Sequence, residues 1–166
     1  MAEANPTVAA YQRVLANSHN NIGLLLSTTG KPAEAMTSFE SALAIKQRLA
    51  EANPTVVKYQ NDLAANHNNI GILLRQTGKP AEAMKSYESA LAIRQTLTHE
   101  HPESPEFASD LSLVLHNIAE IDLDAGRFEK ARTRLRQAVE LGRKALAVNP
   151  ANPTYRRWLC TITRIT

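Results

Sequence analysis

The chain has 166 residues, a net charge of +3 and 43% hydrophobic residues, which is enough apolar content for one continuous core. Its unbroken apolar runs are too short to cross a membrane, and its first residues lack the basic and apolar segments of a signal peptide. A single cysteine, Cys160, excludes an internal disulfide and favours a reducing, cytoplasmic compartment.

The sequence repeats with a period of 48 residues, and its first two units are identical at 32 of 48 positions. A fixed period of this size is typical of a solenoid, in which each repeat packs mainly against its neighbours. We therefore predict a single domain over residues 1–166. Its parts are units at 5–52, 53–100 and 101–148, followed by a terminal helix at 149–166.

The first unit is predicted to form two helices. Pro6 opens the first helix, because a proline in the first turn lacks only an N–H that has no partner there. Gly30 ends this helix by taking a left-handed conformation, and Pro32 opens a second helix that runs to about Ala52. The first helix carries an apolar stripe at Val8, Tyr11, Leu15, Ile22 and Leu25.

The second and third units repeat this pattern and predict four more helices. In the third unit Ser104-Pro105 is a better helix start than Pro102, and Asn152-Pro153 opens a seventh helix. Gly30, Gly78 and Gly126 recur at the same position of each unit, and the connection at each of them is short. The two helices of each unit are therefore expected to be antiparallel neighbours. Small residues at repeated positions, among them Gly23 and its counterpart Ala119, indicate close helix packing. Phe39 and Tyr87 are expected to be buried.

The repeated positions resemble tetratricopeptide repeats. In the first unit the resemblance lies in Ile22, Gly23, Gly30, Ala35, Phe39 and Ala42, and the same register recurs in the next two units. It implies an all-α, right-handed α-solenoid. The period is longer than the family's usual one, and such long units are similar to those of kinesin-light-chain-type arrays and of bacterial signalling proteins.

The resemblance also implies the ligand and its site. In this family the first helix of each unit lines a concave face that binds extended peptides or partner helices, and no cofactor is implied. The corresponding residues are Asn17, Asn20, Asn21 and Leu24, then Asn68, Asn69, Ile72 and Gln76, then His116, Asn117 and Glu120. Asn21, Asn69 and Asn117 form a column of amides, each able to donate to and accept from a peptide bond. Alternatively, these amides bond to neighbouring helices or water.

Other functions have weaker support in the sequence. His19 and His67 occupy equivalent packing positions of successive units, so we expect no catalytic site there or elsewhere. His99 and His101 are close in sequence, but they are weak evidence for a metal site. Residues 1–126 carry 9 basic and 14 acidic residues, whereas residues 127–166 carry 10 basic and 2 acidic residues. This basic end leaves nucleic-acid binding as an alternative, although few aromatic residues accompany it. A regulatory module of a larger signalling enzyme is a further alternative.

The two ends of the chain lead to one more expectation. Residues 2–4 match residues 50–52, the tail of a second helix, so we expect the chain to be a fragment of a longer protein. Solenoids need polar caps, and the first helix and the terminal helix both carry uncovered apolar residues. The sequence thus predicts self-association through the ends of the array, either head to tail or around a two-fold axis.

Overall fold

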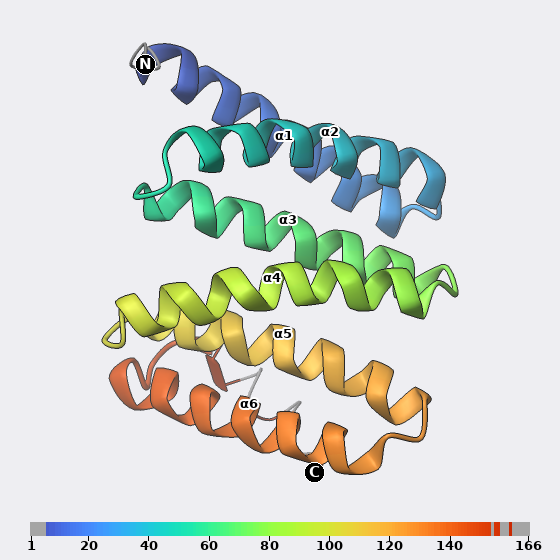
Figure 1. The fold of residues 1–166 in the computed structure, drawn as a ribbon, viewed down its shortest axis with the longest axis vertical. Helices are drawn as coiled ribbons and strands as arrows, with labels where there is room; N and C mark the ends of the chain where they lie inside the picture. Colours follow the sequence, from blue (N-terminus) through green and yellow to red (C-terminus); the bar gives the residue numbers. More distant parts are fainter. Residues whose placement is uncertain (1–5, 154, 157–159, 161–166) are drawn as a thin grey trace. The chain divides into compact units, whose positions relative to one another are not determined.

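The computed structural model describes residues 6–153, 155, 156 and 160, and this part of the chain is helical and contains no strand (Figure 1). The predicted all-α fold is therefore confirmed, and the predicted seventh helix, from about Pro153, falls mostly on residues outside the described range. The helices are α1 (Pro6–Thr28), α2 (Pro32–Ala52), α3 (Val57–Gln76), α4 (Pro80–Glu100), α5 (Pro105–Asp124) and α6 (Phe128–Val148).

The chain forms two compact units, Met1–Ser86 and Tyr87–Thr166, and their boundary lies within α4. In the first unit α2 packs against both α1 and α3, and α1 also touches α3. In the second unit α5 and α6 form an extensively packed antiparallel pair. Consecutive helices therefore pack in pairs, as the short connections predicted.

The predicted helix ends are present except at the start of the second unit, where α3 begins at Val57 and not at Pro54. Pro54 lies instead in a turn that the Val56 amide closes by donating to the Asn53 carbonyl at 3.1 Å. Gly30, Gly78 and Gly126 have φ values of 77°, 77° and 69°, so each takes the left-handed conformation that ends a first helix. The Ser104 hydroxyl accepts a hydrogen bond from the Phe107 amide at 3.4 Å, which confirms the start predicted for the third unit. The Asn152 side chain accepts from the Tyr155 amide at 3.3 Å in the same way.

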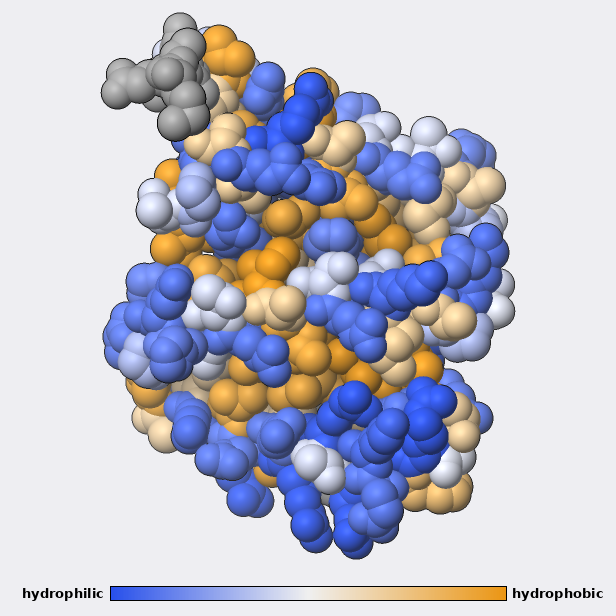
Figure 2. Space-filling view, viewed as in Figure 1, coloured by the Kyte–Doolittle hydropathy of each residue, from blue (hydrophilic) through white to orange (hydrophobic). Residues whose placement is uncertain are grey.

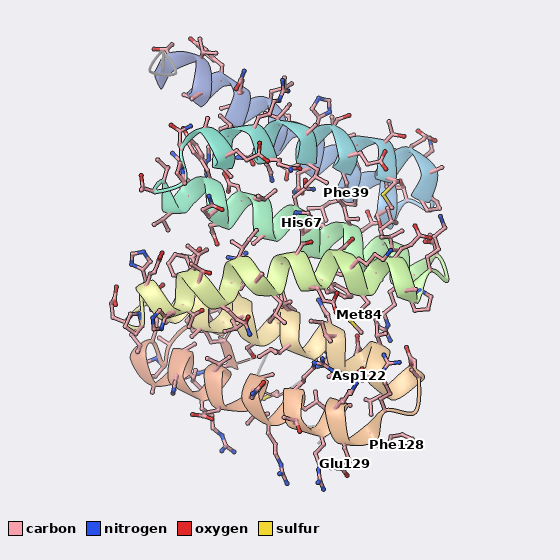
Figure 3. The ribbon with its side chains drawn as sticks, in the orientation of Figure 1. Phe39, His67, Met84, Asp122, Phe128 and Glu129 are labelled. Carbon is pink, nitrogen blue, oxygen red and sulfur yellow. The ribbon has the colours of Figure 1, made fainter. Side chains whose placement is uncertain are left out.

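Small residues bring the two helices of a repeat close together. Ala35 and Ala42 of α2 are fully buried, and Phe39 between them is 1% exposed (Figure 3). A Cβ atom added to Gly23 would lie only 2.6 Å from the Phe39 ring, so this glycine is required by contact with an aromatic side chain. This confirms the close packing inferred for the mid-helix glycine.

The third repeat solves the same packing problem with different side chains. Ala119 and Leu135 take the places of Gly23 and Phe39, and both belong to the buried cluster between α5 and α6. A methyl group on the first helix is thus combined with a smaller side chain on the second. The two arrangements fill the space between paired helices with similar total volume.

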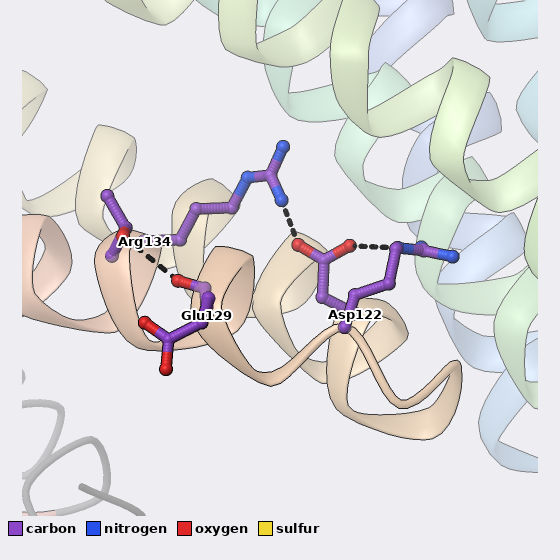
Figure 4. A network of polar contacts seen from close by, with 5 residues as sticks. Asp122, Glu129 and Arg134 are labelled. Atoms are coloured by element: carbon purple, nitrogen blue, oxygen red, sulfur yellow. Dashed lines mark hydrogen bonds and ion pairs between the residues drawn. The ribbon is translucent and has the colours of Figure 1, made fainter.

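A buried carboxylate joins α5 to α6. Asp122, which is 1% exposed, forms ion pairs with Arg127, at 2.7 Å, and with Arg134 (Figure 4). The first two repeats have Leu26 and Leu74 at the position of Asp122. The third repeat therefore replaces an apolar contact near the hairpin with an ion-pair network.

We predict that Gly23 and Phe39 are energetically coupled. Gly23→Ala should destabilise the chain by about 1–2 kcal/mol, because overpacking against the ring outweighs the higher helix propensity of alanine. Phe39→Leu should make room for the methyl group that Gly23→Ala adds, as Leu135 does for Ala119 in the third repeat. In a double-mutant cycle measured by urea unfolding, the double variant should lose less stability than the sum of the single variants. Strict additivity would show that the two residues do not share one space.

We also predict that the Asp122 network stabilises the α5–α6 hairpin. Asp122→Ala should lower the free energy of unfolding by roughly 1–3 kcal/mol, because two partly exposed guanidinium groups lose the buried carboxylate that accepts their charged hydrogen bonds. Asp122→Leu with Arg134→Ser restores the residues of the other repeats, and it should recover much of the loss. Thermal unfolding of the three proteins compares these values. Equal loss in the single and the double variant would contradict a pairing role for Arg134.

Candidate peptide-binding face

The face predicted to bind a peptide is best defined in the first compact unit, where α1 and α3 lie in contact. Of its residues, Asn21, Leu24 and Gln76 are exposed, and Asn17, Asn20, Asn69 and Ile72 are half-buried. Asn68 is buried. The face therefore offers several amides and two aliphatic side chains, and these side chains differ in how deeply they are buried.

Hydrogen bonds between amides join α1 to α3 on this face. The Asn69 Nδ2 atom donates to Asn20 Oδ1 at 3.0 Å, and Asn66 Nδ2 donates to the same oxygen at 3.4 Å. One member of the predicted asparagine column thus bonds to the preceding repeat, as the alternative interpretation allowed. The Asn69 oxygen and its second N–H are not used in this bond. The amide is therefore oriented by Asn20 while it keeps one acceptor and one donor.

Asn66 is a buried member of this cluster that the sequence did not single out. Its side chain is fully buried, and its Oδ1 atom has no hydrogen-bond partner within the described part of the chain. A buried oxygen of this kind usually takes a water molecule. The sequence signal that could have identified Asn66 is a difference between repeats, because Ser18 and Val114 occupy the same position in the other two. Only the second repeat has an amide at this position.

Ion pairs fix the register between neighbouring repeats. Arg13 Nε on α1 lies 2.5 Å from Asp62 Oδ2 on α3, and Lys46 of α2 is buried close to both. Burial lowers the pKa of the Lys46 ammonium, which the Asp62 carboxylate opposes and the Arg13 charge reinforces. The sequence analysis did not identify this cluster, because its members lie in three different helices.

The second compact unit contains an equivalent pair. Arg94 Nη1 of α4 lies 2.7 Å from Asp110 Oδ2 of α5. Burial raises the pKa of Asp110, and Glu106 adds to this while Arg94 opposes it. Since Arg94 and Asp110 stand at the positions of Lys46 and Asp62, both repeat junctions place a cation from a second helix beside an acid from the next first helix.

The predicted site residues of the third repeat lie deeper than those of the first. His116 and Asn117 are buried, and Glu120 is half-buried. The His116 Nε2 atom is 3.8 Å from Glu120 Oε1, one helical turn away. Exposure in the asparagine column therefore falls from Asn21 through Asn69 to Asn117.

His101 and His67 lie in ordinary structural surroundings. The His101 ring lies against Phe107 in a tilted arrangement with ring centroids 5.6 Å apart, and its Nδ1 is 3.8 Å from a Glu103 carboxylate oxygen. His67 is half-buried on α3 (Figure 3), and desolvation lowers its pKa. No three His, Cys, Asp or Glu side chains come together as a metal site among the residues that the structure describes.

The sequence profile described as "Tetratricopeptide repeat" matches residues 15–54, 68–103 and 113–151. The chain belongs to the tetratricopeptide repeat family. Repeats of this family generally serve as non-catalytic scaffolds, which favours a protein that binds other proteins. None of the helices described has the length and apolar content of a membrane span.

Comparison with individual proteins adds little to the family assignment. No curated protein matches the chain. Among solved structures, a chain titled "DHF119 filament" is 10% identical, with a TM-score of 0.41, over 96% of this chain and 80% of the other. Similarity at this level carries no argument about the shape or the assembly of the present protein.

We predict that His67 makes the fold sensitive to mild acid. Its pKa is lowered in the folded chain, so the unfolded chain takes up the proton first as the pH falls below about 6.5. The contribution of neutral His67 to stability is therefore present above this pH and is lost below it. Urea unfolding between about pH 7.5 and pH 5.5 should show a smaller loss for His67→Gln than for the parent chain. Parallel pH profiles would contradict this role.

Proposed function

We propose that the chain is a protein-interaction module that binds an extended peptide across the α1–α3 face. The observation that carries this proposal is the Asn69–Asn20 hydrogen bond, which orients one amide while leaving it an acceptor and a donor. Preorganised groups bind at a lower entropic cost than mobile ones. The family assignment supports a protein ligand in general, and the binding mode is our inference.

Asn21 supplies a second amide to the proposed site. It is exposed, and within the described residues its side chain makes no hydrogen bond. Asn21 and Asn69 are equivalent positions of successive repeats, so together they can pair with two peptide units of one extended strand. Leu24 and Ile72, each three residues further along its helix, offer apolar contact to the ligand's side chains.

Nucleic-acid binding by α6 has less support. Figure 2 shows hydrophilic side chains gathered over this helix, in keeping with its basic sequence. However, Arg134 pairs with Asp122, Arg132 with Glu129 at 2.6 Å, and Lys144 with Glu140 at 3.5 Å. Three of the six cations of α6 are therefore paired with carboxylates, which weakens but does not remove the attraction for phosphate. A cytoplasmic location, suited to a chain whose only thiol is Cys160, is part of the proposal.

We predict that Asn21 and Asn69 bind peptide backbone. Peptides of about twelve residues selected from a displayed random library on the intact chain would serve as probes, with affinities measured by fluorescence anisotropy. Asn21→Ala and Asn69→Ala should each weaken binding by roughly 1–2 kcal/mol, about 5- to 30-fold, because each removes hydrogen bonds to a peptide unit.

A control separates this effect from general changes in α1. Gln12→Ala alters an exposed amide on the same helix outside the proposed face, and it should leave the affinity unchanged. The loss at Asn21 and Asn69 should also be similar for selected peptides of unrelated sequence, since backbone atoms are common to all. Undiminished binding by the Asn21→Ala/Asn69→Ala double variant would refute the proposed mode.

A further inference from the structure

The peptide-binding face of the first compact unit has very few ionisable groups. Residues 14–28 of α1 and residues 63–74 of α3 contain no Lys, Arg, Asp or Glu, and their ionisable side chains are His19 and His67. Both histidines are half-buried, and burial lowers the pKa of His67, which keeps its ring uncharged at neutral pH. We term the residues that face the ligand in these two stretches the neutral face: Asn17, Asn20, Asn21, Leu24, Asn69 and Ile72.

Charged residues at the edge of the neutral face engage one another. The Arg13 guanidinium donates to both Asp62 carboxylate oxygens, at 2.5 and 3.4 Å. This pair lies two helical turns, about 10 Å along the helices, from the hydrogen bond between Asn20 and Asn69. Lys46 of α2 interacts electrostatically with the same pair, but it is only 4% exposed. Within the described part of the chain, the neutral face therefore offers no counter-ion to a charged group of the ligand.

The repeat fold itself does not require this neutrality. In the third repeat Glu120 stands at the position of Leu24 and Ile72, and Asp124 follows at the position of Gln76. Even so, α5 forms its helix and packs extensively against α6. A first helix thus accommodates acids at these positions, and the absence of charge is a property of the first unit's own sequence.

The proposed binding mode defines which ligand residues meet the neutral face. Two peptide units of the ligand pair with Asn21 and Asn69, which belong to neighbouring helices in contact. Helices in contact lie about 8–10 Å apart, and an extended peptide advances about 3.3 Å per residue, so about three residues cover this distance. We call them the central residues of the ligand. Leu24 and Ile72 are the apolar side chains nearest in sequence to the two pairing amides.

We propose, resting on the function proposed above, that the neutral face selects peptides whose central residues are uncharged. A charged side chain placed there loses water and gains no opposite charge, which costs free energy. Uncharged side chains avoid this cost, and aliphatic ones bury apolar area against Leu24 and Ile72. Selection therefore acts by rejecting charged segments of either sign, while the amides bind the backbone that all peptides share.

Variants of one selected peptide test the proposal from the side of the ligand. The peptides are acetylated and amidated to remove their terminal charges, and one central residue is replaced by Lys, Glu or Gln. Lys and Glu should each weaken binding to the intact chain by about tenfold or more, and Gln should weaken it much less. The same Lys at the last residue of the peptide is the matched control and should leave the affinity unaltered. Affinity for the uncharged peptide should change by less than about twofold between roughly 50 and 500 mM salt.

A change of specificity tests the proposal from the side of the chain. Leu24→Glu installs the acid of the third repeat at an exposed position of the first. It should strengthen binding of the Lys-centred peptide by about tenfold relative to the parent chain, and it should weaken binding of the Glu-centred peptide further. Gln12→Glu, an exposed change on α1 outside the neutral face, should have neither effect. Circular dichroism and thermal unfolding check that both variants are folded.

The outcomes separate charge selection from peptide binding itself. Equal affinity for the Lys-, Glu- and Gln-centred peptides would overturn charge selection, and the binding mode would still stand if Asn21→Ala and Asn69→Ala weakened binding. A Leu24→Glu variant that does not favour the Lys-centred peptide would also overturn it. Failure of every selected peptide to bind the parent chain would instead refute the proposed function, and charge selection would fall with it.

Discussion

Close approach between paired helices, at side chains no larger than alanine, is the contact on which each repeat depends. The fully buried Ala35 and Ala42 place the Phe39 ring against the bare backbone of Gly23. This contact fixes where α2 lies on α1, and therefore which side of each helix remains for other contacts. The third repeat preserves the approach with Ala119 and Leu135, so the constraint is a total volume rather than a particular residue pair.

Polar contacts determine the register between repeats. Arg13 with Asp62, and Asn20 with Asn69, join the first helices of neighbouring repeats, and Arg94 with Asp110 performs the same function in the second compact unit. Apolar surfaces can slide, whereas hydrogen bonds and ion pairs are lost within a small displacement. The amide that we assign to peptide binding is thus oriented by the interaction that aligns its repeat. Ligand recognition and repeat alignment would then depend on the same side chains.

The sides of α1 have different chemistry because their neighbours differ. Its inner side, with Ala16 and Gly23, is shaped by α2. A polar side with Asn21 faces the ligand in our proposal, and the outer side carries exposed apolar residues such as Tyr11 and Leu25. One helix therefore presents three sides of different chemistry.

The sequence by itself determined the repeat, the helix ends and the buried small residues, because each is a local or periodic property. Gly30 had to take positive φ to end a helix, Ser104 could cap one, and the recurrence of small residues marked the sides on which paired helices approach. Only the tertiary structure decided which polar residues meet. The Arg13–Asp62–Lys46 cluster and the Asn66 oxygen depend on the angle between three helices, which no spacing within one helix encodes. For the same reason, equivalent asparagines predicted as one column differ in depth, since exposure depends on what packs around each repeat.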